Sequence, residues 1–343
     1  MEVKLPISDN FITCFCTSYR VTTEKGTIVI DKTDLIILST LAKNSRSSFN
    51  IIGSEVGLTS KSVKARVKKM IHRRVIEKFV VRVNPAAFGF KVVIVLVRTS
   101  NGINKDDIIK RIKQLGDTAY YAYHMGGTCV AALLIKNPLD DLFVRALNHR
   151  LMPATVVSIF VLESRIEPVV LSETDLRIIK CLLLNGARTE IADIAKEVGI
   201  SEKTATRRLT RIKDSNILDF SIQCSPSLMI GYIQFAIPMI TTRFHRQSVL
   251  ERMYSEFQEN ILYSPGVIDS EDRLTFVLVA ENVFTVDSIL TKVSSFEEVK
   301  SADVYILTKW QFNDDWIIKE ISNRISQRRP LLHESIKINN PIN

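Results

Sequence analysis

Residues 55–67 read EVGLTSKSVKARV and residues 197–209 read EVGISEKTATRRL, so one pattern occurs twice in this chain of 343 residues. Each copy starts upstream at a matching segment, Thr33-Asp34-Leu35 or Thr174-Asp175-Leu176, and leads to a hydrophobic pair, Val75-Ile76 or Ile217-Leu218. The copies lie about 140 residues apart, far more than the roughly 20–50 residues of solenoid repeats. The repeat therefore predicts a duplicated two-domain unit.

Each copy carries the start and stop signals of three helices. Asp31 and Ser172 can cap the first helix, since an aspartate follows each of them three residues later in a box-like arrangement. Gly57 and Gly199 can close a short second helix, because glycine adopts positive φ without a steric penalty. A third helix follows at once, so the pattern predicts a tight turn between the second and third helices.

The third helix is basic on one side and apolar on the other. In the first copy Val63, Val67 and Met70 share one face, while Lys61 and Lys64 lie opposite. A helix that docks by an apolar face and presents cations outward is typical of the recognition helix of a helix-turn-helix, which enters the major groove of DNA. The expected DNA contacts are Thr59, Ser60, Lys61, Ser62, Lys64, Arg66, Lys68, Lys69, Arg73, Ser201, Glu202, Lys203, Thr206, Arg207, Arg208 and Arg211.

The net charge of +9 favours a polyanionic partner, and most of it lies on the first copy. Residues 31–82 hold twelve Lys and Arg against four acidic residues, whereas residues 172–224 hold nine against eight. By counterion release the first copy should dominate non-specific affinity for DNA. The second copy either contributes more to recognition of the DNA sequence than to contacts with the phosphate backbone, or has drifted toward a structural role.

The segment after each basic helix predicts a short β wing and then a βαββαβ unit, the order of a ferredoxin-like fold. In the first copy the expected elements are a strand at 91–99, a helix at 105–115, strands at 119–125 and 128–135, a helix at 138–148 and a strand at 155–162. In the second they are a strand at 232–241, a helix at 246–258, strands at 261–269 and 273–280, a helix at 284–293 and a strand at 302–308. Pro238 implies an edge or a bulge in its strand, since proline lacks a ladder N–H.

The chain is thus expected to be an α+β protein with two tandem winged helix-turn-helix domains, each followed by a ferredoxin-like domain. The expected boundaries are an N-terminal extension at 1–27, winged helix-turn-helix domains at 28–84 and 169–226, ferredoxin-like domains at 85–168 and 227–310, and a C-terminal helix and tail at 311–343.

These motifs resemble the Lrp/AsnC (feast/famine) transcriptional regulators, once per half of the chain. Besides residues 55–67, the segment from Asn84-Pro85 to Gly89 matches the family's domain-linking strand, and Arg66 and Arg208 match its recurrent recognition-helix arginine. The resemblance implies a sequence-specific regulator that binds double-stranded DNA and self-associates through its ferredoxin-like domains. Family members usually carry one unit per chain, so two units in one chain can pair as a covalent pseudo-dimer or form homo-oligomers. Because the two winged helix-turn-helix domains, the DNA-binding heads, differ from each other, we expect an asymmetric DNA site.

The resemblance also implies a small-molecule effector such as an amino acid, bound near the β2–β3 hairpin of the family. The candidate effector residues are Met125, Gly126, Gly127 and Thr128. Here Cys129 stands about where the family has an aspartate, and the second copy has no glycine in register. Both halves therefore depart from the family's usual amino-acid site.

Nothing else in the sequence indicates a catalytic, metal or cofactor site. The five cysteines are scattered, the N-terminus has no secretory signal, and no apolar run reaches the roughly 20 residues of a membrane helix. We therefore expect a cytoplasmic, nucleoid-associated protein without a membrane partner. Two alternatives stay open. One is an architectural DNA-binding protein without effector, and the other is a siroheme-decarboxylase-like enzyme. Siroheme decarboxylases share this architecture, and His124 and Tyr120 superficially resemble the histidine and tyrosines of their pocket.

Overall fold

The structure is a computed structural model that describes residues 29–100, 103–137, 139–162, 164, 166–265 and 272–327. The expected N-terminal extension, residues 1–27, and the final residues 328–343 lie outside the described residues.

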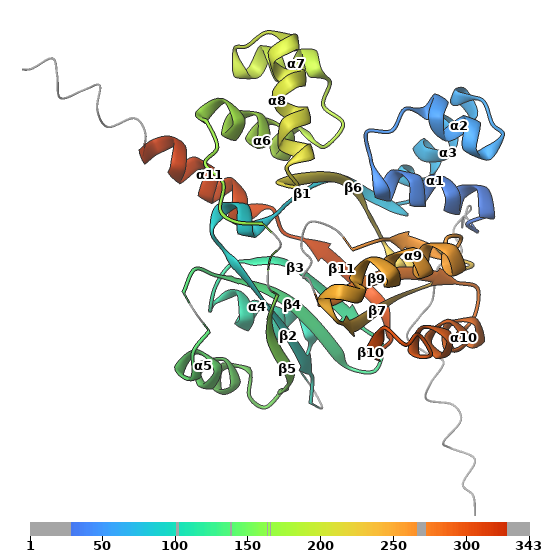
Figure 1. Ribbon diagram of the computed structural model, residues 1–343, viewed down its shortest axis with the longest axis vertical. Coiled ribbons are helices and arrows are strands. Elements are labelled where there is room, and N and C mark those ends of the chain that lie inside the picture. The colour runs from blue at the N-terminus through green and yellow to red at the C-terminus, as the bar shows by residue number, and fades with distance from the viewer. Residues whose placement is uncertain are drawn as a thin grey trace, which may run out of the picture.

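Two three-helix heads lie at the top of Figure 1. The first head comprises α1 (Lys32–Lys43), α2 (Phe49–Val56) and α3 (Ser60–His72), and the second comprises α6 (Glu173–Asn185), α7 (Ile191–Val198) and α8 (Glu202–Asp214). Capping boxes at Asp31 and Ser172 begin α1 and α6, as the sequence predicts. Gly57 (φ 67°) and Gly199 (φ 77°) end α2 and α7 in the left-handed region, so both turns need the freedom of glycine.

The strand after each recognition helix joins the two heads. β1 (Ile76–Val83) and β6 (Leu218–Cys224) form a two-stranded antiparallel sheet, with Val81 opposite Phe220. Each strand was expected as the wing of its own head, and it pairs instead with its counterpart from the other repeat. The Arg82 guanidinium donates to both carboxylate oxygens of Asp219, at 2.6 and 2.7 Å, so a two-point ion pair fixes this register.

Below the heads lie two βαββαβ units, which confirm the predicted fold class. The first contains η1 (Pro85–Phe88), β2 (Lys91–Arg98), α4 (Lys105–Lys113), β3 (Thr118–His124), β4 (Thr128–Ile135), α5 (Asp141–Leu151) and β5 (Thr155–Leu162). The second contains η2 (Pro226–Leu228), β7 (Ile233–Thr241), η3 (Arg243–His245), α9 (Arg246–Phe257), β8 (Ile261–Tyr263), β9 (Arg273–Ala280), α10 (Val283–Ser294), β10 (Val299–Ala302) and β11 (Tyr305–Phe312). The single closing strand expected at 302–308 is thus two strands, β10 and β11.

Strand β11 unites the two units into one sheet. It pairs with β7 of its own unit and, antiparallel, with β3 of the first unit, where Trp310 lies opposite Ala122. The resulting strand order is β5-β2-β4-β3-β11-β7-β9-β8, with β10 beside β7. Helices α4 and α5 cover one face of the first half, and α9 and α10 cover the corresponding face of the second.

Of the two settings expected at Pro238, an edge or a bulge, the edge is wrong, while the β10 strand that pairs with β7 beside Pro238 has an irregular register. β7 has β9 on one side and β11 followed by β10 on the other, so it is an interior strand. Pro238 lies where that neighbour changes from β11 to β10, and the Asp303 backbone N–H donates to its carbonyl oxygen at 3.1 Å. The missing proline N–H is therefore tolerated at a break in the neighbouring strand rather than at an edge.

The last helix, α11 (Asp315–Gln327), packs back onto the first half of the chain. Its Trp316, Ile317 and Ile321 side chains are buried in the core that also contains α6. The Trp316 ring contacts Phe88 and Phe90 edge-on, with ring centroids 6.2 and 5.5 Å apart. The two halves are therefore interleaved at the end of the chain as well as in the sheet.

We expect Trp316→Ala to lower the free energy of unfolding by about 3–5 kcal/mol, because it leaves a cavity in a buried core. Urea unfolding followed by far-UV circular dichroism measures the change. Lys319→Ala is the matched control on the same helix, since the Lys319 side chain is 70% exposed, and it should change stability by less than about 0.5 kcal/mol. Equal effects of the two substitutions would contradict the packing of α11.

Candidate nucleic-acid interface

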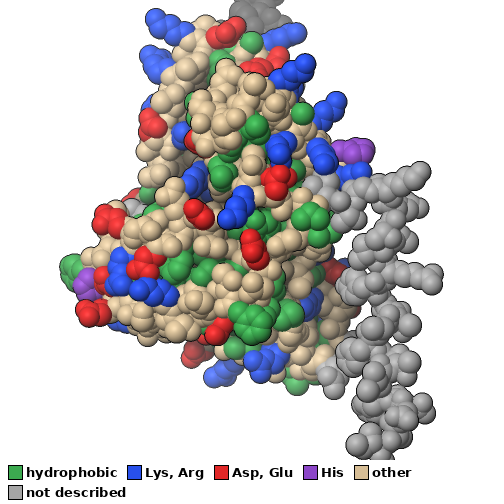
Figure 2. Space-filling model, turned by 90° about the vertical axis from the view of Figure 1, so that its right-hand side faces the viewer, with side chains coloured by type: hydrophobic (Ala, Val, Ile, Leu, Met, Phe, Trp, Pro, Cys, Tyr) green, Lys and Arg blue, Asp and Glu red, His purple; other side chains and the backbone are tan. Residues whose placement is uncertain are grey.

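The cations expected to contact DNA lie mostly on the outer surface of the two recognition helices. On α3 the side chains of Lys61, Lys64, Lys68, Lys69 and the C-cap residue Arg73 are exposed. The opposite face of α3 is buried through Val63, Val67 and Met70, so the apolar stripe predicted from the sequence docks the helix. Figure 2, viewed from the right-hand side of Figure 1, shows Lys and Arg side chains projecting from the upper part of the molecule, where the heads lie.

Within its bounds, the second recognition helix presents as many exposed cations as the first, but acidic residues lie among them. Exposed on α8 are Lys203, Thr206, Arg207, Arg211 and Lys213, together with the acidic Glu202 and Asp214, whereas Ala205 and Leu209 are among its buried residues. Glu202 occupies the first turn of α8, where the first copy has Ser60. The charge difference found in the sequence therefore persists on the exposed surfaces.

The two recognition helices begin in the same way. Thr59 Oγ1 accepts a hydrogen bond from the Ser62 backbone N–H at 3.2 Å, and Ser201 Oγ accepts one from Thr204 at 3.3 Å. Such a capped N-terminus carries the positive end of the helix dipole, which favours a phosphate placed beside it.

The recurrent arginine of the first recognition helix is turned toward its own head. Arg66 Nη1 lies 2.8 Å from Asp31 Oδ2 and 2.8 Å from Asp34 Oδ1, both at the start of α1. Burial alone would raise the pKa of Asp31, but hydrogen bonds from the Asp34 backbone and from Arg66 hold that pKa below its usual value. The Asp34 and Asp31 carboxylates in turn raise the pKa of Arg66.

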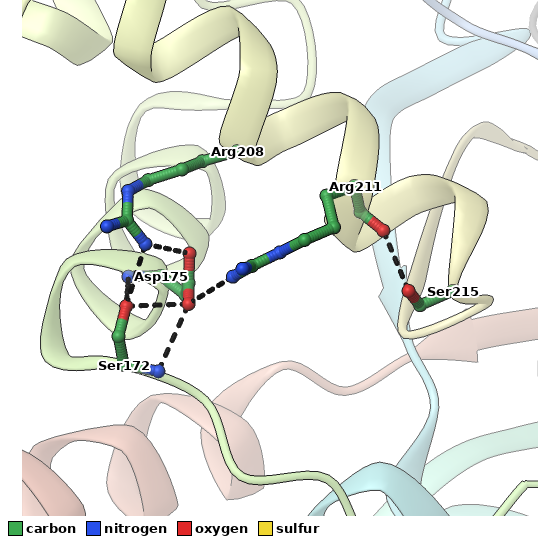
Figure 3. A network of polar contacts seen from close by, with 5 residues as sticks. All are labelled: Ser172, Asp175, Arg208, Arg211 and Ser215. Atoms are coloured by element: carbon green, nitrogen blue, oxygen red, sulfur yellow. Dashed lines mark hydrogen bonds and ion pairs between the residues drawn. The ribbon is translucent and has the colours of Figure 1, made fainter.

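The second head repeats this contact in a more buried form (Figure 3). Arg208 Nη1 lies 2.9 Å from Asp175 Oδ1, and Arg211 Nη2 lies 2.7 Å from Asp175 Oδ2. The Asp175 side chain is only 1% exposed. Burial alone would raise its pKa, but hydrogen bonds from the Ser172 hydroxyl and Arg208 keep that pKa below the usual value.

These ion pairs give Arg66, Arg208 and Arg211 a local partner that the sequence analysis did not foresee. Each joins the recognition helix to the capped start of the first helix of its head, and so fixes the angle between the two helices. A contact of these three arginines with DNA stays a prediction. No signal in the sequence gave this pairing, because the burial of the acidic capping-box residue, Asp34 or Asp175, is seen only in the structure.

Two further arginines, missed in the sequence analysis, bind the heads to each other. Arg46 Nη1 donates to the carbonyl oxygens of Ala187 and Thr189, at 2.8 and 2.9 Å, and Arg188 Nη1 donates to those of Ser45 and Ser47. Arg46 and Arg188 occupy equivalent positions in the two repeats, between the first and second helices. We call this reciprocal pair the arginine clasp. Because each guanidinium crosses to the other head, the clasp fixes the separation of α3 and α8.

The candidate effector residues form the turn between β3 and β4. Met125 is 62% exposed, Gly126 and Gly127 have positive φ, and Thr128 Oγ1 lies 3.2 Å from His124 Nδ1. The His124 side chain is buried, and this burial, with a smaller effect of the Lys105 ammonium, lowers its pKa to about 4. The turn is thus a surface feature, and its expected role in effector binding stays a prediction.

Comparison with known proteins matches both heads to one family. The AsnC-type helix-turn-helix domain matches residues 30–71 and again residues 171–213. The HTH-type transcriptional regulator LrpA of Pyrococcus horikoshii is 34% identical over 114 residues, which is 33% of this chain and 81% of LrpA. An HTH-type transcriptional regulator of Methanocaldococcus jannaschii is 32% identical over 109 residues, 31% of this chain and 73% of the relative.

The chain belongs to the Lrp/AsnC family. DNA binding and regulation of transcription come with that membership. The segment aligned with each of these relatives is about a third of the present chain. A solved structure of the siroheme decarboxylase NirDL covers 86% of this chain and 100% of its own, with 13% identity and a TM-score of 0.45. At that level of similarity the activity of the enzyme does not transfer to this Lrp/AsnC protein.

None of the helices in the described part of the chain is long and apolar enough to cross a membrane.

Asp175→Asn should lower the free energy of unfolding at neutral pH by about 2–4 kcal/mol, because Arg208 and Arg211 lose a buried anionic partner. The folded pKa of Asp175 is depressed below its usual 3.8, so this stabilisation is present above the usual pKa and is lost as the pH falls through the folded pKa. Urea unfolding in steps from neutral pH to about pH 3 measures the difference between wild type and variant, which should shrink with acid.

Asp193→Asn, at an exposed position on α7 of the same head, is the control. It should leave stability nearly unchanged across the whole range of pH. If Asp175→Asn is no more destabilising than Asp193→Asn, the ion-pair network does not hold the second head together.

Proposed function

We propose that this Lrp/AsnC protein binds double-stranded DNA sequence-specifically through two non-identical heads that a single chain presents as an intramolecular pair. The observation that carries the proposal is the pairing of the two repeats with each other: β1 with β6, and β11 with β3. A family homodimer has two identical heads, and here the covalent pair has two different ones. The expected DNA site is therefore asymmetric.

The exposed charges support a division of labour between the heads. Cations of α3 at Lys61, Lys64, Lys68 and Lys69 extend along one side of the helix and can neutralise several phosphates. On α8, Lys203 and Arg207 lie in the first two turns, from which side chains reach base edges in the known helix-turn-helix geometry. The first head thus supplies most of the salt-dependent affinity, and the second contributes more to sequence preference.

The arginine clasp supports a fixed spacing between the two half-sites. Four hydrogen bonds cross between the heads through Arg46 and Arg188, and the β1–β6 ladder lies directly beneath them, as Ser45 N–H donates to the Phe220 carbonyl at 3.1 Å. We also propose that the six segments expected from the sequence describe the organisation of the protein, except that β11 continues past residue 310 to Phe312. Any further self-association would then join pseudo-dimers.

The main alternative is an architectural protein that coats DNA without sequence preference. Footprinting over a panel of promoters separates the two functions. Short, defined protected regions support the regulator, and uniform protection of every sequence supports the architectural protein. For the siroheme-decarboxylase-like alternative, an absorbance titration of a tetrapyrrole with the purified protein is sufficient, since an unchanged spectrum excludes binding.

Replacement of Lys61, Lys64 and Lys68 by Ala should weaken DNA binding and reduce the slope of log K against log salt by about 2–3, because each phosphate contact contributes about 0.9 to that slope. Fluorescence anisotropy of a labelled duplex over a salt series measures it. The control removes three exposed lysines that lie outside the heads, Lys91, Lys300 and Lys319. It changes the net charge equally and should leave the slope almost intact. Equal losses in both triple variants would contradict the assignment of α3 to the groove.

Replacement of Lys203 and Arg207 by Ala should alter sequence preference more than bulk affinity. Selection from a randomised duplex library, followed by sequencing, measures preference at each position of the site. We expect relaxed preference within one half-site, with a loss of about 1–3 kcal/mol of discrimination per lost base contact. A uniform loss of affinity for all sequences would show that the second head only contacts the DNA backbone.

A further inference from the structure

A cavity of about 340 Å³ lies inside the αβ part of the chain, away from both recognition helices. Side chains from both repeats line it, among them Leu96 and Phe160 from the first and Ala236 and Val277 from the second. These residues project from the sheet faces that α4, α5, α9 and α10 leave uncovered. We call this cavity the lumen. Its size falls within the range of small-molecule sites in proteins.

The lumen is partly enclosed, because the continuous sheet curls until its two ends approach each other. Arg273 of β9 lies over the ring of Phe160 of β5, with 4.0 Å between the guanidinium carbon and the ring centroid. Strands β5 and β9 belong to different repeats and stand near opposite ends of the strand order. The contact between them brings the far ends of the sheet together, so the sheet approaches a closed barrel. Ser158 of β5 and Thr275 of β9 line the lumen near this seam.

The walls of the lumen are chiefly aliphatic and aromatic. Ile94, Leu96, Val130, Phe160 and Trp310 are typical of them. Polar atoms are present in smaller number, and two of the polar residues, His124 and Tyr305, stack on each other with ring centroids 4.7 Å apart. A mostly apolar wall with a few polar groups suits an apolar molecule oriented by one or two hydrogen bonds.

Few charged side chains line the lumen, and their signs cancel once the ion pair of Arg82 is counted. Arg82 lines the lumen, and its guanidinium is fully engaged by the Asp219 carboxylate in a two-point ion pair. The His124 imidazole is neutral at pH 7. The remaining charged lining residues are one cation, Arg273, and one anion, Asp303. An anionic or cationic ligand would therefore lose its hydration without gaining an unbalanced counter-charge, so an uncharged ligand fits best.

The lumen wall is in direct contact with the strands that join the two heads. Arg82 belongs to β1 itself. Strand β6 is contacted from β11. The Trp310 indole Nε1 donates to the Cys224 carbonyl at the end of β6 at 2.9 Å, and the Phe312 backbone N–H donates to the Gln223 side-chain oxygen at 3.2 Å. A molecule that displaces Arg82 or Trp310 by a fraction of an ångström must move β1 or β6, and with them the heads.

We propose that the lumen is a binding site for a small, uncharged, mainly aromatic or aliphatic molecule, and that its occupancy changes the relative position of the two heads through β1 and β6. This site is distinct from the surface turn at residues 125–128. The binding part stands by itself, whereas the regulatory part rests on the proposed function of the heads.

The probe for the test is N-phenyl-1-naphthylamine, an uncharged aromatic amine whose fluorescence rises in apolar surroundings. We expect saturable, one-to-one binding to the full-length protein. In the Trp316→Phe variant, where Trp310 is the sole tryptophan, the same titration should quench tryptophan emission with the same midpoint. A linear, unsaturable signal would overturn the site.

Three comparisons locate the probe and test its charge. Ser158→Phe and Thr275→Phe, which fill the lumen from its two edges, should each raise the Kd at least about tenfold, whereas Val157→Phe at the exposed neighbouring position should leave it unchanged. 1-Anilinonaphthalene-8-sulfonate has the same ring system with an added sulfonate, and should bind at least about tenfold more weakly. Equal binding by the lumen variants and the Val157→Phe control would overturn the location, and equal binding of the sulfonate would overturn the ligand class.

The regulatory part is tested by measuring DNA affinity with and without the saturating amine. Linkage requires that DNA change the Kd of the amine by the same factor as the amine changes that of DNA. Saturable amine binding with unchanged DNA affinity would overturn the coupling and leave the DNA-binding proposal intact. Loss of DNA binding as such would overturn the proposed function, while the titration of the amine would still decide the site.

Discussion

The pairing of β11 with β3 is the interaction on which the rest of the structure depends. It joins the closing strand of the second repeat to the edge strand of the first, and so converts two short sheets into one. The Trp310 indole and the Phe312 backbone N–H link this joint to β6, and β6 is paired in turn with β1. The heads and the lumen are both consequences of this union, because neither the β1–β6 ladder nor the enclosing sheet exists in one repeat alone.

The helical heads could be predicted from local chemistry, since caps, turn glycines and apolar periodicity act over a few residues. Asp31 and Ser172 begin the first helices and Gly57 and Gly199 end the second ones as expected. The partners of Arg66 and Arg208 could not be predicted, because helical periodicity gives the face of a residue but not the element packed against its edge. Pro238 shows the same limit in the sheet: its missing N–H is local, whereas the break between β10 and β11 that tolerates it is tertiary.

The pattern of residues did not predict the pairing between repeats either. A strand with alternating apolar residues can pair with its own hairpin or with a distant copy, and both satisfy the same alternation. The wing strands β1 and β6 illustrate this, since their pattern was read as local and their partners are each other. The lumen follows from the same non-local pairing. Of its lining residues only Tyr120 and His124 stood out in the sequence as candidate pocket residues, and nothing there indicated that residues of the other repeat lie around them. Duplication thus leaves a repeat in the sequence, while the way the copies associate is decided by packing.

Fusion of two family units also removes the constraint of identity between heads. Arg46 and Arg188 keep the two heads at one separation, while the exposed cations of α3 and α8 have diverged. The central claim is that one chain supplies both heads for one DNA site. Native mass spectrometry of the complex with the shortest duplex that gives full protection tests this claim most directly. We predict one chain per duplex. Two chains on a duplex with two half-sites, with one head of each chain bound, would contradict the claim.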